Sequence, residues 1–138
     1  MYEKLGNFIH GEWRTSNEIG QDVLNPANES VLAFLPHATE KDLEDALESA
    51  QKGFKIWRET PVQKRASILH KTADLIEERT NQISQVITLE QGKPLSEAKG
   101  EILRTIETFR WNAEFGIDNL EKRSVLRPNG LRQSVRVE

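Results

Sequence analysis

Hydrophobic residues recur every three or four positions through the middle of the chain, in three separate stripes. The first stripe comprises Leu43, Ala46, Leu47, Ala50, Phe54 and Trp57. The second comprises Ala66, Leu69, Ala73, Ile76, Ile83 and Ile87, widened by Ile68, Leu75 and Val86. The third comprises Leu95, Ala98, Ile102, Ile106, Phe109 and Ala113. This spacing is typical of amphipathic helices and predicts three of them, at about 40–57, 61–91 and 94–117.

Residues with strong positional preferences mark the ends of these helices. Thr39 is expected to cap the first helix, with Asp42 three residues further on. Thr60 is expected to cap the second helix, with Pro61 in its first turn. The run Gly92–Pro94 is expected to end the second helix, because glycine suits the carboxy-terminal cap and proline cannot continue a helix.

Strand-like runs precede the helices, within residues 1–36. His10 and Gly11 separate two short runs and predict a tight hairpin, in which the glycine supplies a positive φ angle. Residues 31–35 form a continuous apolar run that ends at Pro36. A run of this kind is typical of a strand that is buried on both faces.

A second hairpin is predicted after the helices. Asn129 and Gly130 lie between the runs 125–128 and 131–137, and Asn-Gly between two strand-like runs is a strong hairpin signal. The chain is therefore predicted to be α/β, with three long helices and short β elements at both ends.

Composition restricts the possible functions. The net charge of the 138 residues is −3, which gives no general attraction to nucleic acid or to an anionic membrane. Without cysteine these residues contain no disulfide, thiolate nucleophile or cysteine-ligated metal. We see neither a signal-peptide pattern nor the roughly 20 apolar residues that cross a bilayer, so a cytoplasmic location is expected.

The sequence contains no complete phosphate-binding, dinucleotide-binding or metal-binding motif. Gly92 and Lys93 resemble the end of a phosphate-binding loop, but Ile87 and Pro94 occupy positions that would need glycine and Ser or Thr. No dinucleotide-binding glycine motif occurs. The dispersed histidines lack metal-site spacing; they are His10, His37 and His70.

Two charged features have alternative interpretations. Glu90 lies beside the predicted helix end, so it is either a solvated surface acid or a carboxylate with a tuned pKa. The last stretch is locally basic but lacks aromatic residues, which favours an edge strand or a subunit contact over nucleic-acid binding. Its cations are Lys122, Arg123, Arg127, Arg132 and Arg136.

Several segments, taken in order, resemble the amino-terminal third of NAD(P)-dependent aldehyde dehydrogenases. The similar segments are Phe8–Trp13, Asn25–Ala27 followed by Val31, Ala46–Trp57, the set Arg65, Leu69, Ala73 and Leu75, and Thr88–Ala98. The last of these is the most specific, and it is most similar to the succinate-semialdehyde dehydrogenase branch. The resemblance implies a fragment of the aldehyde dehydrogenase fold.

The resemblance also implies a domain plan and an activity. Residues 1–120 would belong to the cofactor-binding domain, and residues 121–138 would begin the hairpin through which subunits associate into a homo-oligomer. The full-length enzyme would oxidise an aldehyde, with succinate semialdehyde as the candidate, to the carboxylic acid using NAD or NADP.

The catalytic groups of that family match no position in this sequence. The family uses a cysteine thiolate, an asparagine in a Pro-Trp-Asn segment and a glutamate. Asn112 follows Trp111 but lacks the flanking prolines, so the role is not transferred. We therefore expect no catalytic, cofactor-binding or metal residue here, and the chain alone is expected to be inactive and to bind no cofactor. Glu90 would fall near a helix end where some relatives hold a structural cation.

Two other classes of function stay open. The capped amphipathic helices could form a free-standing helical interaction module. Alternatively, the strand at 131–137 could insert a regulatory fragment into the oligomer of a full-length relative. If the chain is a piece of a larger fold, its helix stripes lack their sheet, and the isolated chain is expected to be prone to aggregation.

Overall fold

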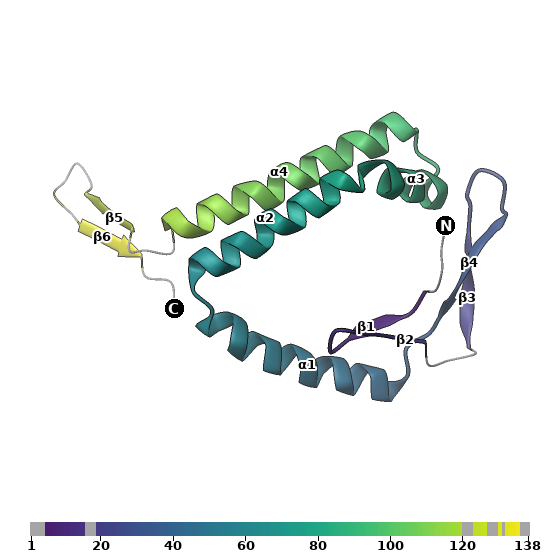
Figure 1. Ribbon diagram of the computed structural model, residues 1–138, viewed down its shortest axis with the longest axis horizontal. Helices are drawn as coiled ribbons and strands as arrows, with labels where there is room; N and C mark the ends of the chain where they lie inside the picture. Colours follow the sequence, from purple (N-terminus) through teal and green to yellow (C-terminus); the bar gives the residue numbers. More distant parts are fainter. Residues whose placement is uncertain (1–4, 16–18, 120–122, 127–129, 131, 136–138) are drawn as a thin grey trace. The chain divides into compact units, whose positions relative to one another are not determined.

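The computed structural model describes residues 5–15, 19–119, 123–126, 130 and 132–135. Within these residues four strands come first, then four helices, then two strands (Figure 1). The elements are β1 (Asn7–Ile9), β2 (Glu12–Arg14), β3 (Gly20–Leu24), β4 (Val31–Pro36), α1 (Glu40–Glu59), α2 (Val62–Glu78), α3 (Thr80–Gln91), α4 (Leu95–Asn119), β5 (Arg123–Leu126) and β6 (Arg132–Val135). The predicted α/β class, with β elements at both ends, is confirmed.

The chain divides into two compact units. The first comprises Met1–Glu59 and Asn81–Gly100, and the second comprises Thr60–Thr80 and Glu101–Glu138. Each unit is therefore built from two stretches of sequence, and α4 contributes to both.

The first hairpin forms where the sequence predicts it. β1 and β2 are antiparallel, with Ile9 opposite Glu12. The two residues between them, His10 and Gly11, have φ angles of 56° and 83°. Both angles are positive, which is the backbone that a two-residue hairpin turn with the natural strand twist requires.

The apolar run at 31–35 forms a strand, but the expectation that it is buried on both faces is wrong. β4 pairs with β3 in an antiparallel two-stranded sheet. Val31 is 59% exposed and Phe34 is 46% exposed. The described residues supply no further strand for this sheet, so its apolar side chains keep contact with solvent.

Thr39 caps α1 as predicted. The Asp42 backbone N–H donates to Thr39 Oγ1 at 3.1 Å, and the Thr39 backbone N–H donates to Asp42 Oδ2 at 2.9 Å. These reciprocal bonds form a capping box with Asp in the place of Glu. Asp42 is only 5% exposed, so the box also closes a buried corner.

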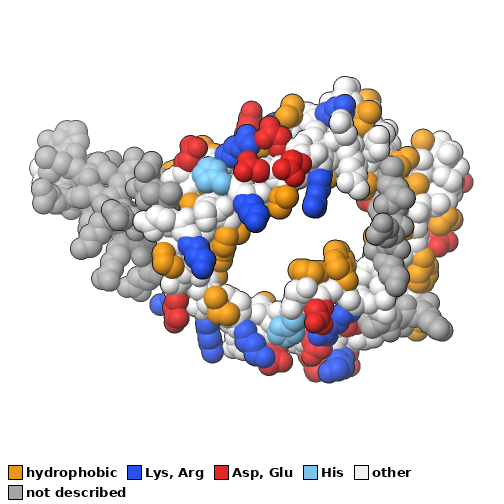
Figure 2. Space-filling view, viewed as in Figure 1, with side chains coloured by type: hydrophobic (Ala, Val, Ile, Leu, Met, Phe, Trp, Pro, Cys, Tyr) orange, Lys and Arg blue, Asp and Glu red, His pale blue; other side chains and the backbone are white. Residues whose placement is uncertain are grey.

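The apolar stripe of α1 lies at the surface. Leu43, Leu47 and Phe54 are 59%, 63% and 64% exposed. In Figure 2 hydrophobic side chains are visible at the surface between charged ones of both signs. The helical spacing of this stripe was predicted correctly, but the described residues do not cover it.

The single helix predicted at 61–91 is wrong, because α2 ends at Glu78 and α3 begins at Thr80. The Thr80 hydroxyl donates to the carbonyl oxygen of Glu77 at 2.8 Å, and the Arg79 N–H donates to that of Ile76 at 3.2 Å. These bonds use carbonyls that a continuing helix would need, a competition that is typical of threonine.

Thr60 does not cap α2, contrary to the prediction. Pro61 occupies the capping position with a ψ angle of 140°, and no side chain caps the helix. The helix begins one residue later than expected because this extended backbone places Thr60 outside it.

Gly92 ends α3 as predicted. It has a φ of 73°, and its N–H donates to the Thr88 carbonyl oxygen at 2.9 Å. A Cβ atom at this position would lie 3.1 Å from the Pro26 ring. The Pro94 carbonyl then accepts the first backbone bonds of α4, from Glu97 and Ala98.

In the second unit, α2 and α4 lie side by side and run in opposite directions (Figure 1). The buried side chains on these parts of the two helices are Ala66, Ala73, Ile102, Ile106 and Ala113. The α4 members belong to the third predicted stripe, so most of this stripe is buried as expected, whereas its first member, Leu95, is 40% exposed.

The hairpin predicted near the end of the chain is present. β5 and β6 are antiparallel, with Arg123 opposite Val135 and Leu126 opposite Arg132. Gly130 has a φ of 79°, whereas Asn129 lies outside the described residues. None of the helices described is long and apolar enough to cross a membrane.

Arg14 of β2 forms an ion pair with Asp45 of α1. Its Nη1 donates to Asp45 Oδ2 at 2.6 Å, and Lys41 Nζ lies 3.6 Å from Asp45 Oδ1. The hydrogen bond from Arg14 is the main cause that lowers the pKa of Asp45 below its ordinary value of 3.8. A carboxyl with a lowered folded-state pKa stabilises the fold above its unfolded value and loses that effect as the pH falls.

We expect Asp45→Asn to reduce the free energy of unfolding at neutral pH. The difference from the unaltered chain should shrink as the pH falls below 3.8, because protonation of Asp45 removes the ion pair from the unaltered chain, whereas the variant has no carboxyl to titrate. Urea unfolding across a pH series measures it. Glu44→Gln is the control, since Glu44 is an exposed neighbour on the same helix. Equal effects of the two variants at every pH would contradict the expectation.

We expect Gly92→Ala to lower the free energy of unfolding by about 1–2 kcal/mol, because an L side chain is strained at positive φ. The close Pro26 ring adds to the cost. Gly100→Ala is the control: it lies inside α4, its added Cβ meets nothing within 4 Å, and it should stabilise the chain by about 0.5–1 kcal/mol. Urea unfolding that gives both variants the same sign would refute the role of Gly92.

Candidate functional site

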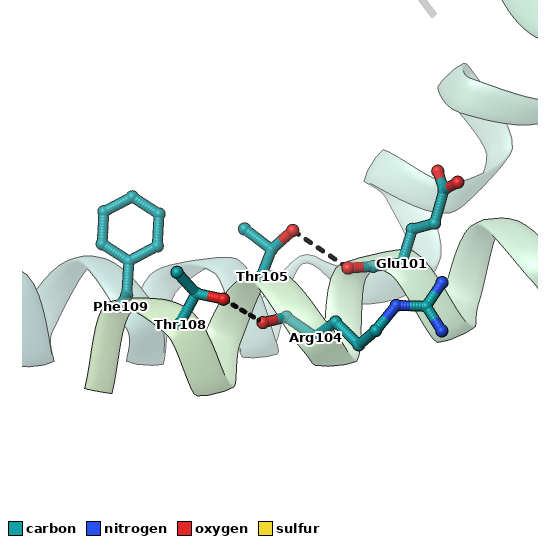
Figure 3. A pocket seen from close by; sticks show the side chains of 5 residues that line it. All are labelled: Glu101, Arg104, Thr105, Thr108 and Phe109. Atoms are coloured by element: carbon teal, nitrogen blue, oxygen red, sulfur yellow. Dashed lines mark hydrogen bonds between the residues drawn. The ribbon is translucent and has the colours of Figure 1, made fainter. Parts of the chain in front are cut away.

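The second unit has a hollow along one face of α4, with a volume of about 440 Å³ (Figure 3). The residues that line it are Glu101, Arg104, Thr105, Thr108 and Phe109. They are spaced at three and four residues along one helix, so they share a face. The described residues provide one wall, which leaves the hollow open on its other sides.

The two threonines of the hollow are held by their own helix. Thr105 Oγ1 donates to the Glu101 carbonyl oxygen at 2.9 Å, and Thr108 Oγ1 donates to that of Arg104 at 2.8 Å (Figure 3). Because each hydroxyl hydrogen is already donated, these hydroxyl oxygens could act toward a ligand only as acceptors.

Arg104 differs from the paired arginines of the chain. Arg14 is paired with Asp45, and Arg110 is paired with Asp74 and Glu77. Arg104 is exposed, and no described carboxylate lies within ion-pair distance of its guanidinium. Figure 3 shows the side chain extended along the helix toward Glu101, with Phe109 at the other end of the hollow.

A guanidinium without an ion-pair partner in the described part of the chain can bind an anion. Its N–H groups form a rigid fork that matches the two oxygens of a carboxylate. Arg104 and Glu101 lie at one end of the hollow and Phe109 at the other, so a small ligand meets a charged end and an aromatic end. This arrangement can orient a molecule that carries a carboxylate, but it contains no nucleophile.

A second hollow, of about 520 Å³, lies in the first unit along α1. It is lined by Gln51, Phe54, Lys55, Arg58 and Glu59. Like the first hollow it has side chains of both charges, but it lies near the carboxy-terminal end of α1, where the helix dipole disfavours anions. This hollow is the weaker candidate.

None of the candidate site residues singled out from the sequence lines either hollow. Glu90 is exposed in the last turn of α3. Among the residues described, no group of three or more His, Cys, Asp or Glu could hold a metal ion. The side-chain amide of Asn112 donates to the Thr108 carbonyl oxygen at 2.8 Å, so this amide is used within α4.

Sequence reasoning missed Arg104. Glu101 and Glu107 lie three residues before and after it, a spacing that favours surface ion pairs on a helix. The pattern therefore indicates an ordinary paired arginine. Only the coordinates, in which neither acid pairs with it, could have drawn attention to this residue.

Comparison with known proteins decides the family. Residues 13–137 match the family model described as "Aldehyde dehydrogenase family". The chain belongs to the aldehyde dehydrogenase family. The resemblance on which the sequence analysis rested is thereby confirmed at the level of the family.

Relatives with known names agree. Malonate-semialdehyde dehydrogenase 2 of Oceanobacillus iheyensis is 46% identical over 114 residues, which are 82% of this chain and 23% of the relative. Malonate-semialdehyde dehydrogenase of Lacticaseibacillus casei is 42% identical over 110 residues, 79% of this chain and 22% of the relative. The aldehyde dehydrogenase chain described here thus spans about a quarter of the length of these relatives.

Solved structures of the family share the fold. Lactaldehyde dehydrogenase from Escherichia coli gives a TM-score of 0.81 at 29% identity, with 90% of this chain and 26% of that chain covered. Succinate-semialdehyde dehydrogenase from Burkholderia pseudomallei gives a TM-score of 0.80 at 31% identity, with 91% and 26% covered. The predicted fragment of the aldehyde dehydrogenase fold is confirmed.

Proposed function

We propose that the chain serves as the amino-terminal part of an enzyme that oxidises a carboxylate-bearing aldehyde to the acid with NAD or NADP. Membership of the aldehyde dehydrogenase family supports the reaction class. The guanidinium of Arg104 in the α4 hollow, which has no carboxylate partner among the described residues, is the observation that carries the substrate class.

The names of the relatives support a semialdehyde substrate. Two relatives above 40% identity are named malonate-semialdehyde dehydrogenases, and one similar structure is a succinate-semialdehyde dehydrogenase. Both substrates carry an aldehyde at one end and a carboxylate at the other. The run Thr88–Ala98 favours succinate semialdehyde by its resemblance to that branch, whereas the named relatives favour malonate semialdehyde. The shared chemistry, a short aldehyde with a carboxylate, is what we propose.

In this proposal Arg104 binds the carboxylate end of the substrate. A fork of two N–H groups fixes the orientation of a planar carboxylate as well as its position. The aldehyde end would then point away from α4. Binding of this kind selects semialdehydes over uncharged aldehydes, because the latter leave the guanidinium without a partner.

The expectation that this chain contributes no dinucleotide contact stays a prediction. Gly92 and Lys93 belong to a helix end, and Gly92 uses its N–H to close α3. We therefore assign no cofactor contact to this chain and derive no step through the cofactor. The proposal of NAD or NADP rests on the family, in which betaine aldehyde dehydrogenase from Staphylococcus aureus, 25% identical, has been solved in complex with NAD+.

The chain alone is proposed to be inactive. The resemblance implies a cysteine thiolate as the nucleophile, and the 138 residues contain no cysteine. Assembly into a homo-oligomer and a cytoplasmic location also stay predictions. So does the division into a cofactor-binding part, 1–120, and an oligomerisation hairpin that begins at 121–138.

A hybrid enzyme tests the proposal. Residues 13–137 of this chain replace the matching segment of the Oceanobacillus iheyensis enzyme, and the formation of NADH is followed with malonate semialdehyde and with propanal. We expect Arg104→Gln to raise KM for malonate semialdehyde about 10–100-fold, since hydrogen bonds between charged groups contribute about 1.5–3 kcal/mol. Turnover of propanal should change little.

Lys99→Gln is the matched control, because Lys99 is an exposed cation of α4 outside the hollow. It should leave both substrates unaffected. Equal losses with both aldehydes after Arg104→Gln would contradict the assignment of the carboxylate to this residue. A folded hybrid with no dehydrogenase activity would instead favour the free-standing helical interaction module.

A further inference from the structure

We propose that Arg110 is a positioning residue. Its contacts with α2 fix the rotation of α4 about its own axis, and this rotation directs the Arg104 guanidinium toward the substrate carboxylate. This inference rests on the proposed function. It concerns the second unit alone, since α2 and this part of α4 both belong to it.

Arg110 forms a forked contact between the two helices. A single nitrogen, Nη2, lies 2.6 Å from Glu77 Oε2 and 3.0 Å from Asp74 Oδ1. The two acids are one turn apart on α2, so they hold the guanidinium from two points along the helix. The hydrogen bonds from Arg110 to Glu77 and then Asp74 raise the pKa of the Arg110 guanidinium.

The apolar contact between the helices is graded along α4. The buried side chains of α4 in this unit are Ile102 and Ile106 toward its start and Ala113 beyond Arg110, and Ala73 on α2 is 0% exposed. Near Arg110 the side chain of Ala113 is therefore small and offers little surface to interlock with a neighbour. A polar contact at the edge of such an interface can therefore select one rotation among several of similar packing quality.

Because α4 is a rigid helix, fixing its rotation at Arg110 also fixes the direction of Arg104. The residues are six positions apart, about 9 Å along the axis and about 240° around it. Arg110 therefore contacts α2, whereas Arg104 lies on a different face of α4 and lines the hollow. A rotation of α4 by one residue, about 100°, would break both contacts of Arg110 and carry Arg104 away from its present direction.

The contact has little effect on stability but a large effect on geometry. Asp74 and Glu77 are 63% and 55% exposed at their side chains, and exposed ion pairs add little to the free energy of folding. The effect of the contact on the orientation of Arg104 matters more for binding than its effect on stability, because a guanidinium recognises a carboxylate only in a narrow range of orientations.

The test uses the 138-residue chain with malonate as the carboxylate probe. The Nε–Hε signal of Arg104 in an NMR titration reports the dissociation constant at that residue. The key variant is Glu77→Gln, which removes one arm of the fork from the opposite helix. The matched control is Glu78→Gln, an exposed acid next to it for which no described cation lies within ion-pair distance.

Both variants remove one negative charge from α2, so electrostatics alone would tighten anion binding in both. We expect Glu77→Gln to weaken malonate binding at Arg104 about three- to tenfold, the size typical of indirect coupling, while Glu78→Gln leaves it unchanged or slightly tighter. Arg110→Lys, which keeps the charge and whose single nitrogen can also donate to both acids, should weaken binding less than Arg110→Gln. Circular dichroism checks that each variant keeps its helices.

The outcomes separate this inference from the proposed function. Identical behaviour of Glu77→Gln and Glu78→Gln would overturn the positioning role while leaving Arg104 as the carboxylate partner. Malonate binding in which the Arg104 signal does not shift, or that survives Arg104→Gln, would overturn the proposed function and the inference with it. Loss of helices in Glu77→Gln would show that the contact is structural and would also overturn the positioning role.

Discussion

The packing of α2 against α4 is the constraint on which the candidate site depends. The buried faces of these helices consist of alanine and isoleucine side chains, and the Arg110 fork lies at their edge. This pairing fixes which face of α4 is buried and therefore which face carries Arg104. The position of the hollow follows from this packing, because rotating α4 about its axis would move its buried face and its exposed face together.

The first unit shows the opposite behaviour. Its turns and caps are well formed: the His10 turn, the box of Thr39 and Asp42, and the contact of Gly92 with Pro26. Yet the apolar stripes of α1 and β4 remain at the surface. Monomeric proteins rarely expose so many large apolar side chains on neighbouring elements. This exposure supports the proposal that the chain works within a longer polypeptide.

Local structure could be read from the sequence because it depends on a few residues with strict backbone preferences. Gly11 and Gly92 take positive φ angles, and Thr39 with Asp42 closes a capping box. The third hydrophobic stripe forms the buried face of α4 for the same reason: its period of 3.6 residues specifies one side of a helix.

The errors arose where a local signal was weak or where burial depends on distant residues. Thr80 interrupts the long predicted helix because its hydroxyl donates to the carbonyl oxygens of Ile76 and Glu77. Threonine also occurs within many unbroken helices, so its presence in the sequence did not predict this interruption. Whether the run 31–35 is covered depends on a neighbouring layer, not on the run itself. Arg104 could not be foreseen because Glu101 and Glu107 lie at pairing distance in sequence but do not pair with it in space.

Hydrogen exchange of backbone amides in the isolated chain tests the central claim most directly. If the α2–α4 pair is the stable constraint, the amides of residues 66–76 and 104–113 exchange more slowly than those of α1, whose apolar face is open. Exchange of α4 at the same rate as α1 would contradict the account. In that case nothing would hold Arg104 in place, and the hollow would not persist in solution.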